Sequence, residues 1–203
     1  MKRIIYPIFV LLMLALNIVL FFHYHQYKNK VSSYLQTAQK ETEKNLTIKD
    51  NIEASILCNS TVLGKITYKD INNNNYNLSN LLEAKTNKFF ICRFSEFDCE
   101  VCIKHAIETI KNKAEKIEGN NIIFLCSFKN NEMLSKMIDH YQLSTYMVFN
   151  TDSTITPIDD WRKPYYFVLD SNSTISDIMI PGKNHNKFIE MYFNNIRDKH
   201  FTN

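Results

Sequence analysis

The sequence predicts an α/β domain, with a mixed sheet flanked by helices, that follows an N-terminal transmembrane helix and a helical stalk. Three observations lead to this fold class. Residues 4–22 carry no charge, strand-like and helix-like segments alternate from residue 52 onward, and a helix-like segment after a buried strand opens on the pattern Cys99-x-x-Cys102. The predicted parts are a transmembrane signal anchor over 1–23, a helical stalk or linker over 24–51 and the α/β domain over 52–203.

Composition excludes several classes of protein. The net charge of +3, from 24 Lys+Arg against 21 Asp+Glu, is too small to predict a nucleic-acid partner. Hydrophobic residues make up 45% and charged residues 22%, which fits neither a disordered chain nor a polytopic membrane protein. The number of cysteines, 5, is odd, so the chain is not a simple disulfide scaffold.

The N-terminal segment is typical of an uncleaved signal anchor. Lys2 and Arg3 precede the apolar run over residues 4–22, whose length is close to the about 20 residues that a helix needs to cross a bilayer. The run ends without a small-residue cleavage pattern or a lipobox cysteine, which argues against a cleaved signal. The basic N-terminus favours a cytoplasmic start, although Lys28 and Lys30 weaken the asymmetry. We therefore expect a single-pass protein of the cytoplasmic (inner) membrane whose C-terminal domain faces the periplasm or the cell exterior.

The stalk is expected to be helical because residues 24–51 are polar and contain neither Gly nor Pro. A short apolar stripe recurs there at helical spacing, at Val31, Tyr34, Leu35 and Ala38.

Strands in the domain are predicted from apolar and β-branched runs between turn signals. The predicted strands cover 61–68, a short segment after the turn that begins at Asp70, 88–94, 121–127, 146–149, 165–169 and 174–180. The runs over 88–94 and 121–127 are continuously apolar, as in strands buried on both faces. The last two strands form a hairpin around residues 170–173.

Helices are predicted from amphipathic spacing and from their ends. The predicted helices are a short one capped at Asn77 or Ser79, and longer ones over 99–117, 132–141 and 184–198. Gly119 is the expected stop of the helix over 99–117. The resulting order implies a mixed sheet with helices on both faces.

The C-x-x-C pattern at the start of the helix over 99–117 is the candidate catalytic site. At a helix N-terminus the first cysteine meets unpaired N–H groups and the helix dipole, both of which stabilise a thiolate. Two intervening residues place the second thiol one turn along, close enough to form a disulfide. We therefore expect Cys99 to attack a substrate disulfide and the more buried Cys102 to resolve the mixed disulfide.

This segment also carries a family resemblance. Residues 88–107 resemble the strand-loop-C-x-x-C-helix of the thioredoxin superfamily, and in particular its membrane-anchored, periplasm-facing group of thiol-disulfide oxidoreductases and thiol-specific antioxidant proteins. The spacing from Phe94 to Cys99 equals that of the family's Phe-Trp-x-x-Trp-Cys, and residues 76–82 resemble its short helix entry. The resemblance covers residues 60–197 and implies a thioredoxin-like fold.

Further along, Arg162-Lys163-Pro164-Tyr165 is similar to the family's cis-proline loop. The resemblance therefore implies a cis peptide bond before Pro164, which would face the active site and leave a backbone edge free for an extended substrate chain. The implied partners are disulfide-containing or oxidised proteins and an electron donor in the membrane or the periplasm.

The sequence departs from the family around the cysteines. Phe97-Asp98 stands where the family has Trp, and no Pro lies between the cysteines. Asp98 and Glu100 are expected to raise the pKa of Cys99 by like-charge repulsion, which favours the disulfide and therefore a reductant. Three nearby cations could offset this effect, namely Lys104, His105 and Arg93.

Two of these cations have alternative roles. His105 could shuttle a proton to Cys102, or it could simply pack against the sheet. Arg93 is expected to form a structural ion pair with Glu96 or Asp98.

Other kinds of site fit less well. A metal site at Cys99, Cys102 and His105 would lack the fourth ligand that zinc normally has. Haem attachment needs His directly after the second cysteine, where Ile103 stands, and the Thr and Arg of a peroxidase loop are missing. We therefore expect no metal and no cofactor.

The sequence predicts a membrane-tethered, extracytoplasmic thiol-disulfide oxidoreductase that acts through Cys-Glu-Val-Cys as a reductant of protein disulfides. The alternative is a redox-inert thioredoxin-fold binding or assembly module anchored to the membrane. Cys92 and Cys126 are expected to be buried thiols, and Cys58 is either a buried thiol or a partner in a disulfide between chains.

Overall fold

A computed structural model describes the chain apart from a few short segments. The described residues are 2–64, 66–77, 88–113, 117, 121–183 and 185–202, with the side chains of 2–12 and 15 left out. The chain divides into two compact units, Met1–Asn45 and Leu46–Asn203.

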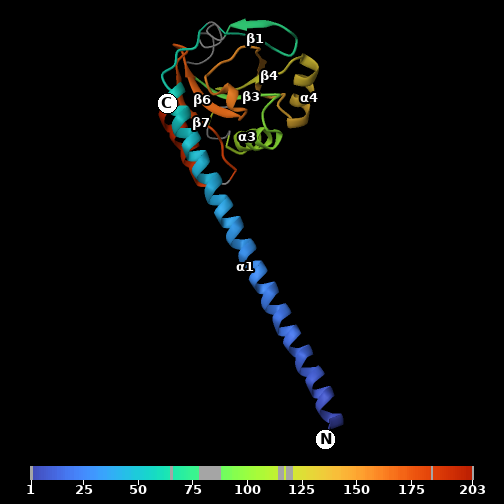
Figure 1. Ribbon diagram of the computed structural model, residues 1–203. Coiled ribbons are helices and arrows are strands. Elements are labelled where there is room, and N and C mark those ends of the chain that lie inside the picture. Colours follow the sequence, from blue (N-terminus) through green and yellow to red (C-terminus); the bar gives the residue numbers. More distant parts are fainter. Residues whose placement is uncertain are drawn as a thin grey trace. The chain divides into compact units, whose positions relative to one another are not determined.

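The first unit is helical throughout its described length. Helix α1 spans Lys2–Cys58 (Figure 1), so the helix expected for the stalk is present, and its last turns belong to the second unit. Among residues with described side chains, no helix is both long and apolar enough to cross a membrane. Residues 4–12 and 15 of the predicted anchor lie outside that set.

The second unit contains a mixed sheet that, in the described part of the chain, has 7 strands in the order β2-β1-β5-β4-β3-β6-β7. The strands are β1 (Thr67–Lys69), β2 (Asn75–Asn77), β3 (Lys88–Ser95), β4 (Ile122–Ser127), β5 (Met147–Asn150), β6 (Tyr165–Asp170) and β7 (Ile175–Met179). Strands β3, β4 and β5 run parallel, whereas β6 pairs antiparallel with β3 and with β7. The C-terminal end of β3 and the N-terminal end of β6 therefore lie at the same edge of the sheet.

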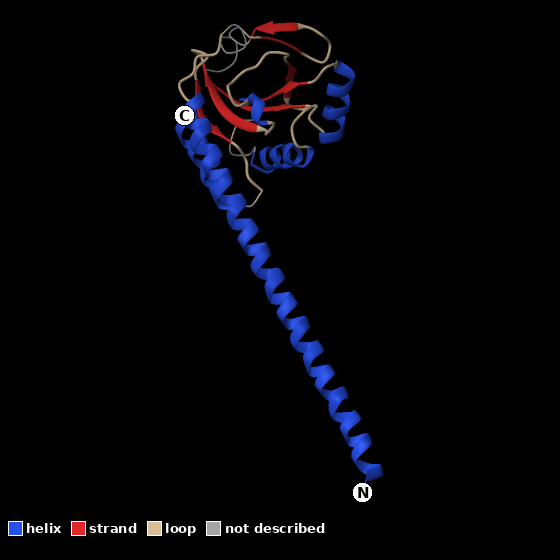
Figure 2. Cartoon of the chain, in the orientation of Figure 1, coloured by secondary structure: helices blue, strands red, loops and turns tan. Residues whose placement is uncertain are grey.

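The helices of this unit are α3 (Glu100–Lys113), α4 (Asn131–Tyr141) and α5 (Asn186–Ile196), with a 3-10 turn η3 (Asp159–Trp161) and a π-helical turn η4 (Arg197–Phe201). Helices α3 and α4 follow the parallel strands β3 and β4, and α5 follows β7 (Figure 2). The path β3-α3-β4-α4-β5 moves in one direction across the sheet, so right-handed crossovers place α3 and α4 on the same face.

Two hydrophobic cores cover the two faces of the sheet. Phe90, Cys92 and Phe94 pack with α3, α4 and α5 on one face. The alternate residues Phe89 and Ile91 pack with the end of α1 on the other. Side chains on both faces of β3 are buried, which explains its continuous apolar sequence. The predicted mixed sheet with helices on both faces is confirmed.

The first predicted strand differs from the structure. It was expected over 61–68, but β1 begins at Thr67, and Val62 forms only an isolated bridge to Thr174. The reason is that this segment runs along the β6–β7 hairpin, where Leu63 N–H donates to the Ser173 carbonyl at 2.8 Å. The short helix expected after Asn77 and the stop at Gly119 lie outside the described residues.

Candidate active site

The fold places the C-x-x-C pattern at the junction of β3 and α3. Cys99 immediately precedes the helix, and its carbonyl accepts hydrogen bonds from the N–H groups of Cys102 at 2.8 Å and Ile103 at 2.9 Å. The backbone N–H groups of Cys102 and Val101 lower the pKa of the Cys99 thiol. Cys99 therefore occupies the N-cap position of α3, beside the N–H groups of the first turn.

The two thiols of the pair have opposite properties. Cys99 is exposed and Cys102 is half-buried, and both are free thiols. Hydrogen bonds from the Cys102 thiol and backbone lower the pKa of Cys99, and the Lys183 ammonium lowers it further. Burial raises the pKa of Cys102 to about 11. The arrangement favours a thiolate on Cys99 while Cys102 keeps its proton.

The lowered pKa of Cys99 corrects the expectation that Asp98 and Glu100 raise it. The Asp98 carboxylate accepts hydrogen bonds from the Ser95 hydroxyl at 2.7 Å and the Ser95 N–H at 3.0 Å. Burial raises the pKa of Asp98 itself, and its charge raises the pKa of Cys102. Asp98 thus closes the loop between β3 and α3. At Cys99, the backbone N–H groups and the Cys102 thiol lower the pKa more than the acidic neighbours raise it.

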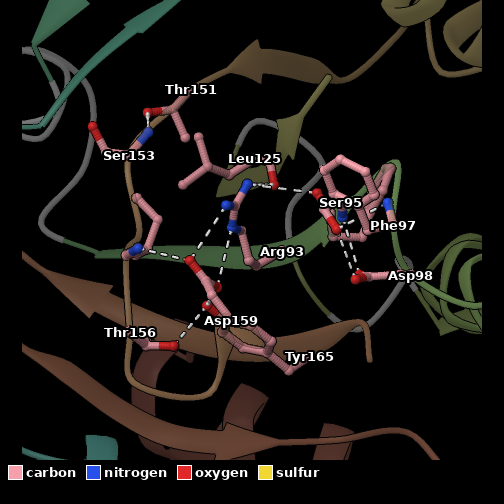
Figure 3. A network of polar contacts seen from close by, with 12 residues as sticks. Arg93, Ser95, Phe97, Asp98, Leu125, Thr151, Ser153, Thr156, Asp159 and Tyr165 are labelled. Atoms are coloured by element: carbon pink, nitrogen blue, oxygen red, sulfur yellow. Dashed lines mark hydrogen bonds and ion pairs between the residues drawn. The ribbon is translucent and has the colours of Figure 1, made fainter. Parts of the chain in front are cut away.

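A buried ion pair lies beneath this loop (Figure 3). Arg93 is 4% exposed, and its guanidinium pairs with the Asp159 carboxylate at 3.3 Å. Tyr165 OH donates to Asp159 Oδ1, and Ile155 N–H donates to Asp159 Oδ2 at 2.7 Å. The network joins β3, the segment before η3 and the start of β6.

The expected pairing of Arg93 with Glu96 or Asp98 is therefore wrong. Arg93 alternates with Phe94 along β3, so its side chain lies on the face toward Asp159. Glu96 instead pairs with Lys129, with 3.7 Å between Oε1 and Nζ.

Pro164 lies at the same edge of the sheet as the cysteine loop. It is buried and directly precedes β6, where Tyr165 is in register with Arg93. A small cavity of about 20 Å³ is lined from both sides, by Ser95 and Asp98 and by Lys163 and Tyr165.

The expected cis bond before Pro164 is not present, because no described peptide bond is cis. The trans form is intrinsically favoured by about 0.5–1 kcal/mol even before proline. Here Arg162, in the left-handed region with φ 53°, turns the chain into β6.

His105 lies one turn after Cys102 on α3. It is half-buried and lines a hollow of about 360 Å³ together with Asn186 and Ile189 of α5. Its Nε2 is buried and has no hydrogen-bond partner among the described residues. The proposed proton shuttle to Cys102 stays a prediction.

The other three cysteines are buried thiols, as expected: Cys58, Cys92 and Cys126. Cys58 is 0% exposed, which rules out the alternative of a disulfide between chains in this fold. In the part of the chain that is described, no group of three His, Cys, Asp or Glu could hold a metal ion.

Sequence reasoning missed Lys183. It follows Gly182 in the exposed loop between β7 and α5, and its charge acts on both Cys99 and Cys102. Nothing in its local sequence distinguishes it from other exposed lysines, because only the fold brings that loop to the start of α3.

Solved structures with this architecture include a candidate electron transfer protein from Aquifex aeolicus VF5. It is 14% identical with a TM-score of 0.50, over 69% of this chain and 94% of its own. A thiol:disulfide interchange protein from Bacteroides sp. is 16% identical with a TM-score of 0.47, over 71% of this chain and 96% of its own. A peroxidoxin from Mycobacterium tuberculosis is 12% identical with a TM-score of 0.47, over 69% of this chain and 98% of its own.

No protein-family model and no curated protein matches the sequence. The fold is therefore assigned from the architecture, a mixed sheet whose parallel strand β3 leads into the helix that begins after Cys99. This chain has the fold of the thioredoxin superfamily.

Proposed function

We propose that this protein is a membrane-tethered, extracytoplasmic thiol-disulfide oxidoreductase in which Cys99 attacks and Cys102 resolves. The observation that carries the proposal is the position of two free thiols, one exposed and one half-buried, at one helix N-terminus, where their pKa values shift in opposite directions. The pKa of Cys99 is lowered and that of Cys102 is raised to about 11. A nucleophilic thiolate and a protonated resolving thiol are what the two steps of disulfide exchange require.

The exchange proceeds in two balanced steps. The Cys99 thiolate attacks one sulfur of the substrate disulfide, forms a mixed disulfide and releases the other substrate sulfur as a thiolate. Cys102 then loses its proton to that thiolate or to water and attacks the Cys99 sulfur. The Cys99–Cys102 disulfide forms and the second substrate sulfur leaves, so the substrate gains the two electrons that the cysteine pair loses.

Polypeptides are the proposed substrates. Two exposed apolar side chains flank Cys99, with Phe97 61% and Val101 59% exposed. Such side chains offer contact area to the apolar residues around a protein disulfide. Pro164 at the neighbouring chain segment would border an extended substrate chain.

The direction of exchange is open to measurement. A reductant was expected because the acidic neighbours were expected to raise the pKa of Cys99, and that pKa is lowered instead. A stabilised thiolate favours the reduced pair and makes the disulfide a better oxidant. The midpoint potential decides between a reductase and an oxidase.

The proposed tether is the apolar segment over residues 4–22. Its described part exposes large apolar side chains along the helix, at Met13, Leu14, Leu16, Ile18, Val19, Leu20, Phe21 and Phe22. Alkaline extraction of membranes from cells that produce the chain tests the tether, because an integral segment stays in the pellet. A reporter fused after Asn203 distinguishes an extracytoplasmic from a cytoplasmic domain.

Trapping of the mixed disulfide tests the chemistry. Purified full-length Cys102→Ala is mixed with a disulfide-bonded peptide and run on a non-reducing gel. A covalent adduct that dithiothreitol cleaves is expected for Cys102→Ala and not for Cys99→Ala. Absence of the adduct in Cys102→Ala, or its presence in Cys99→Ala, would overturn the proposal and favour the redox-inert binding module.

A further inference from the structure

The last turns of α1 contact both chain segments that border the cysteine pair. The Asp50 carboxylate pairs with the ammonium of Lys163, the neighbour of Pro164. Asn51 binds the backbone of Ile180, directly before the loop that contains Lys183. These α1 residues belong to the same compact unit as the site.

Asn51 holds the end of β7 through two hydrogen bonds. Its side-chain nitrogen donates to the Ile180 carbonyl at 3.0 Å, and its Oδ1 accepts from the Ile180 N–H at 2.8 Å. An Asn amide presents a donor and an acceptor side by side, so it pairs with a backbone as a neighbouring strand would. Asn51 is 8% exposed, and removing its side chain would leave two buried backbone groups without partners.

Gly182 brings the loop against α1. A Cβ at this position would lie 2.7 Å from Thr47 Cγ2, 3.0 Å from Thr47 Oγ1 and 3.0 Å from His185 Cδ2. Two of the three staggered positions on the Thr47 Cβ carry a heavy atom, so any rotation of χ1 leaves at least one branch facing residue 182. The backbone of the loop approaches α1 this closely only because residue 182 has no side chain.

Both segments held in this way place a cation beside the site. Lys183 acts through its charge on Cys99 and Cys102. Lys163 lines the small cavity that it shares with Ser95 and Asp98. The contacts of α1 therefore hold one cationic side chain near the thiols and a second at the loop that precedes Cys99.

We propose that Thr47, Asp50 and Asn51 of α1, together with Gly182, are positioning residues of the active site. They hold Lys183 near the cysteine pair and Lys163 at the loop that precedes Cys99. The inference rests on the proposed function, which it deepens by giving the end of α1 a part in it. The last turns of α1 thus tune the reactivity of Cys99 rather than only connecting the sheet to the N-terminal segment.

The test uses full-length Gly182→Ala, with Gly64→Ala as the matched control because a Cβ at Gly64 meets nothing within 4 Å. The readout is the rate at which iodoacetamide alkylates Cys99 between pH 5 and 10, followed by mass spectrometry of the peptide that contains it. Displacement of Lys183 is expected to raise the midpoint of this profile, with about two- to fivefold slower alkylation at pH 7, the size of effect that one exposed charge exerts. Gly64→Ala is expected to keep the wild-type profile.

A double variant separates positioning from misfolding. Thr47→Ala removes two of the three atoms that would crowd a Cβ at residue 182 and leaves only His185 Cδ2 at 3.0 Å, so Gly182→Ala/Thr47→Ala is expected to recover part of the wild-type profile. Asp50→Asn, a milder change at the other segment, is expected to slow exchange with a disulfide peptide by up to about twofold. If Gly182→Ala retains the wild-type profile, or if a folded double variant is as slow as Gly182→Ala, the proposal is overturned.

The alkylation profile needs no substrate disulfide, so it reports on the position of Lys183 even if the chain has no exchange activity. Failure of the proposed function would appear in the trapping experiment alone. Failure of the present inference would appear in the profiles of the glycine variants.

Discussion

The start of α3 and the interior of β3 and β4 contain the same side chain with opposite reactivity. Cys99 is exposed at a helix N-terminus, and hydrogen bonds from Cys102 lower its pKa. Cys92 and Cys126 lie on adjacent strands, fully buried, and desolvation raises the pKa of each well above the usual range. The sequence distance from Cys92 to Cys99 is short, so position in the fold, rather than composition, decides which thiol reacts.

This difference shows how one chain can hold five free thiols of which three are buried and two are accessible. Burial disfavours the thiolate, which is the reactive form, whereas N–H groups at a helix start stabilise it. The buried thiols then act as small hydrophobic side chains in the core.

The largest effect is expected for Cys99→Ser. Loss of the nucleophile should reduce exchange with a disulfide peptide by about 10³-fold or more. Because Cys99 is exposed, the free energy of unfolding should change by less than about 0.5 kcal/mol. Stopped-flow kinetics measures the exchange rate, and urea unfolding measures the free energy of unfolding. A folded Cys99→Ser that exchanges at the wild-type rate would contradict the role of Cys99 as the nucleophile.

High pH should destabilise the domain through the buried thiols. Both states are protonated below the ordinary thiol pKa of about 8.5, but above it the unfolded chain releases protons that native Cys92 and Cys126 retain. Each of these thiols should therefore cost about 1.4 kcal/mol of stability per pH unit above that value. Urea unfolding at pH 7, 9 and 10 measures the slope, and a flat profile would contradict the burial of the two thiols.

Replacement of a buried thiol should affect stability without affecting exchange. Cys126→Ala leaves a small cavity beside Phe94 and Phe124, and we expect a loss of about 1–2 kcal/mol in the free energy of unfolding. The same variant should keep the wild-type exchange rate. It should also lose less stability per pH unit above the ordinary thiol pKa, because only Cys92 of the two thiols remains. A large loss of exchange in a folded Cys126→Ala would indicate that the core thiol takes part in the reaction.

The smallest effect is expected for Lys183→Gln. Removal of this charge should raise the pKa of Cys99, because the ammonium stabilises the thiolate. Alkylation at pH 7 should slow by about two- to fivefold, and less in high salt. Lys187→Gln, an exposed lysine on α5, is the control and should behave as wild type.

Local patterns were enough to predict the central elements and the cysteine pair. The apolar run of β3, the amphipathic spacing of α3 and the position of Cys99 are all short-range features, and the structure confirms them. Long-range pairings could not be predicted in the same way. Arg93 and Asp159 are 66 positions apart, so local spacing favoured the nearer acids Glu96 and Asp98.

The conformation before Pro164 and the role of Lys183 also depend on the assembled fold. The two isomers of a proline bond differ intrinsically by only about 0.5–1 kcal/mol, so a sequence match does not fix the isomer. The pKa of Cys99 was expected to rise because Asp98 and Glu100 are adjacent in sequence. In the structure, the Asp98 carboxylate accepts a hydrogen bond from Ser95. The pKa of Cys99 is lowered by Cys102, by backbone N–H groups of the helix and by Lys183.

The central claim is that Cys99 and Cys102 form one working redox pair. The most direct measurement is thiol trapping of the full-length chain across a glutathione series, with Cys99→Ser as control. We predict a reversible two-electron transition that disappears in Cys99→Ser. A midpoint of about −270 mV would indicate a reductase, and one of about −120 mV an oxidase. No transition, or one that Cys99→Ser retains, would contradict the account.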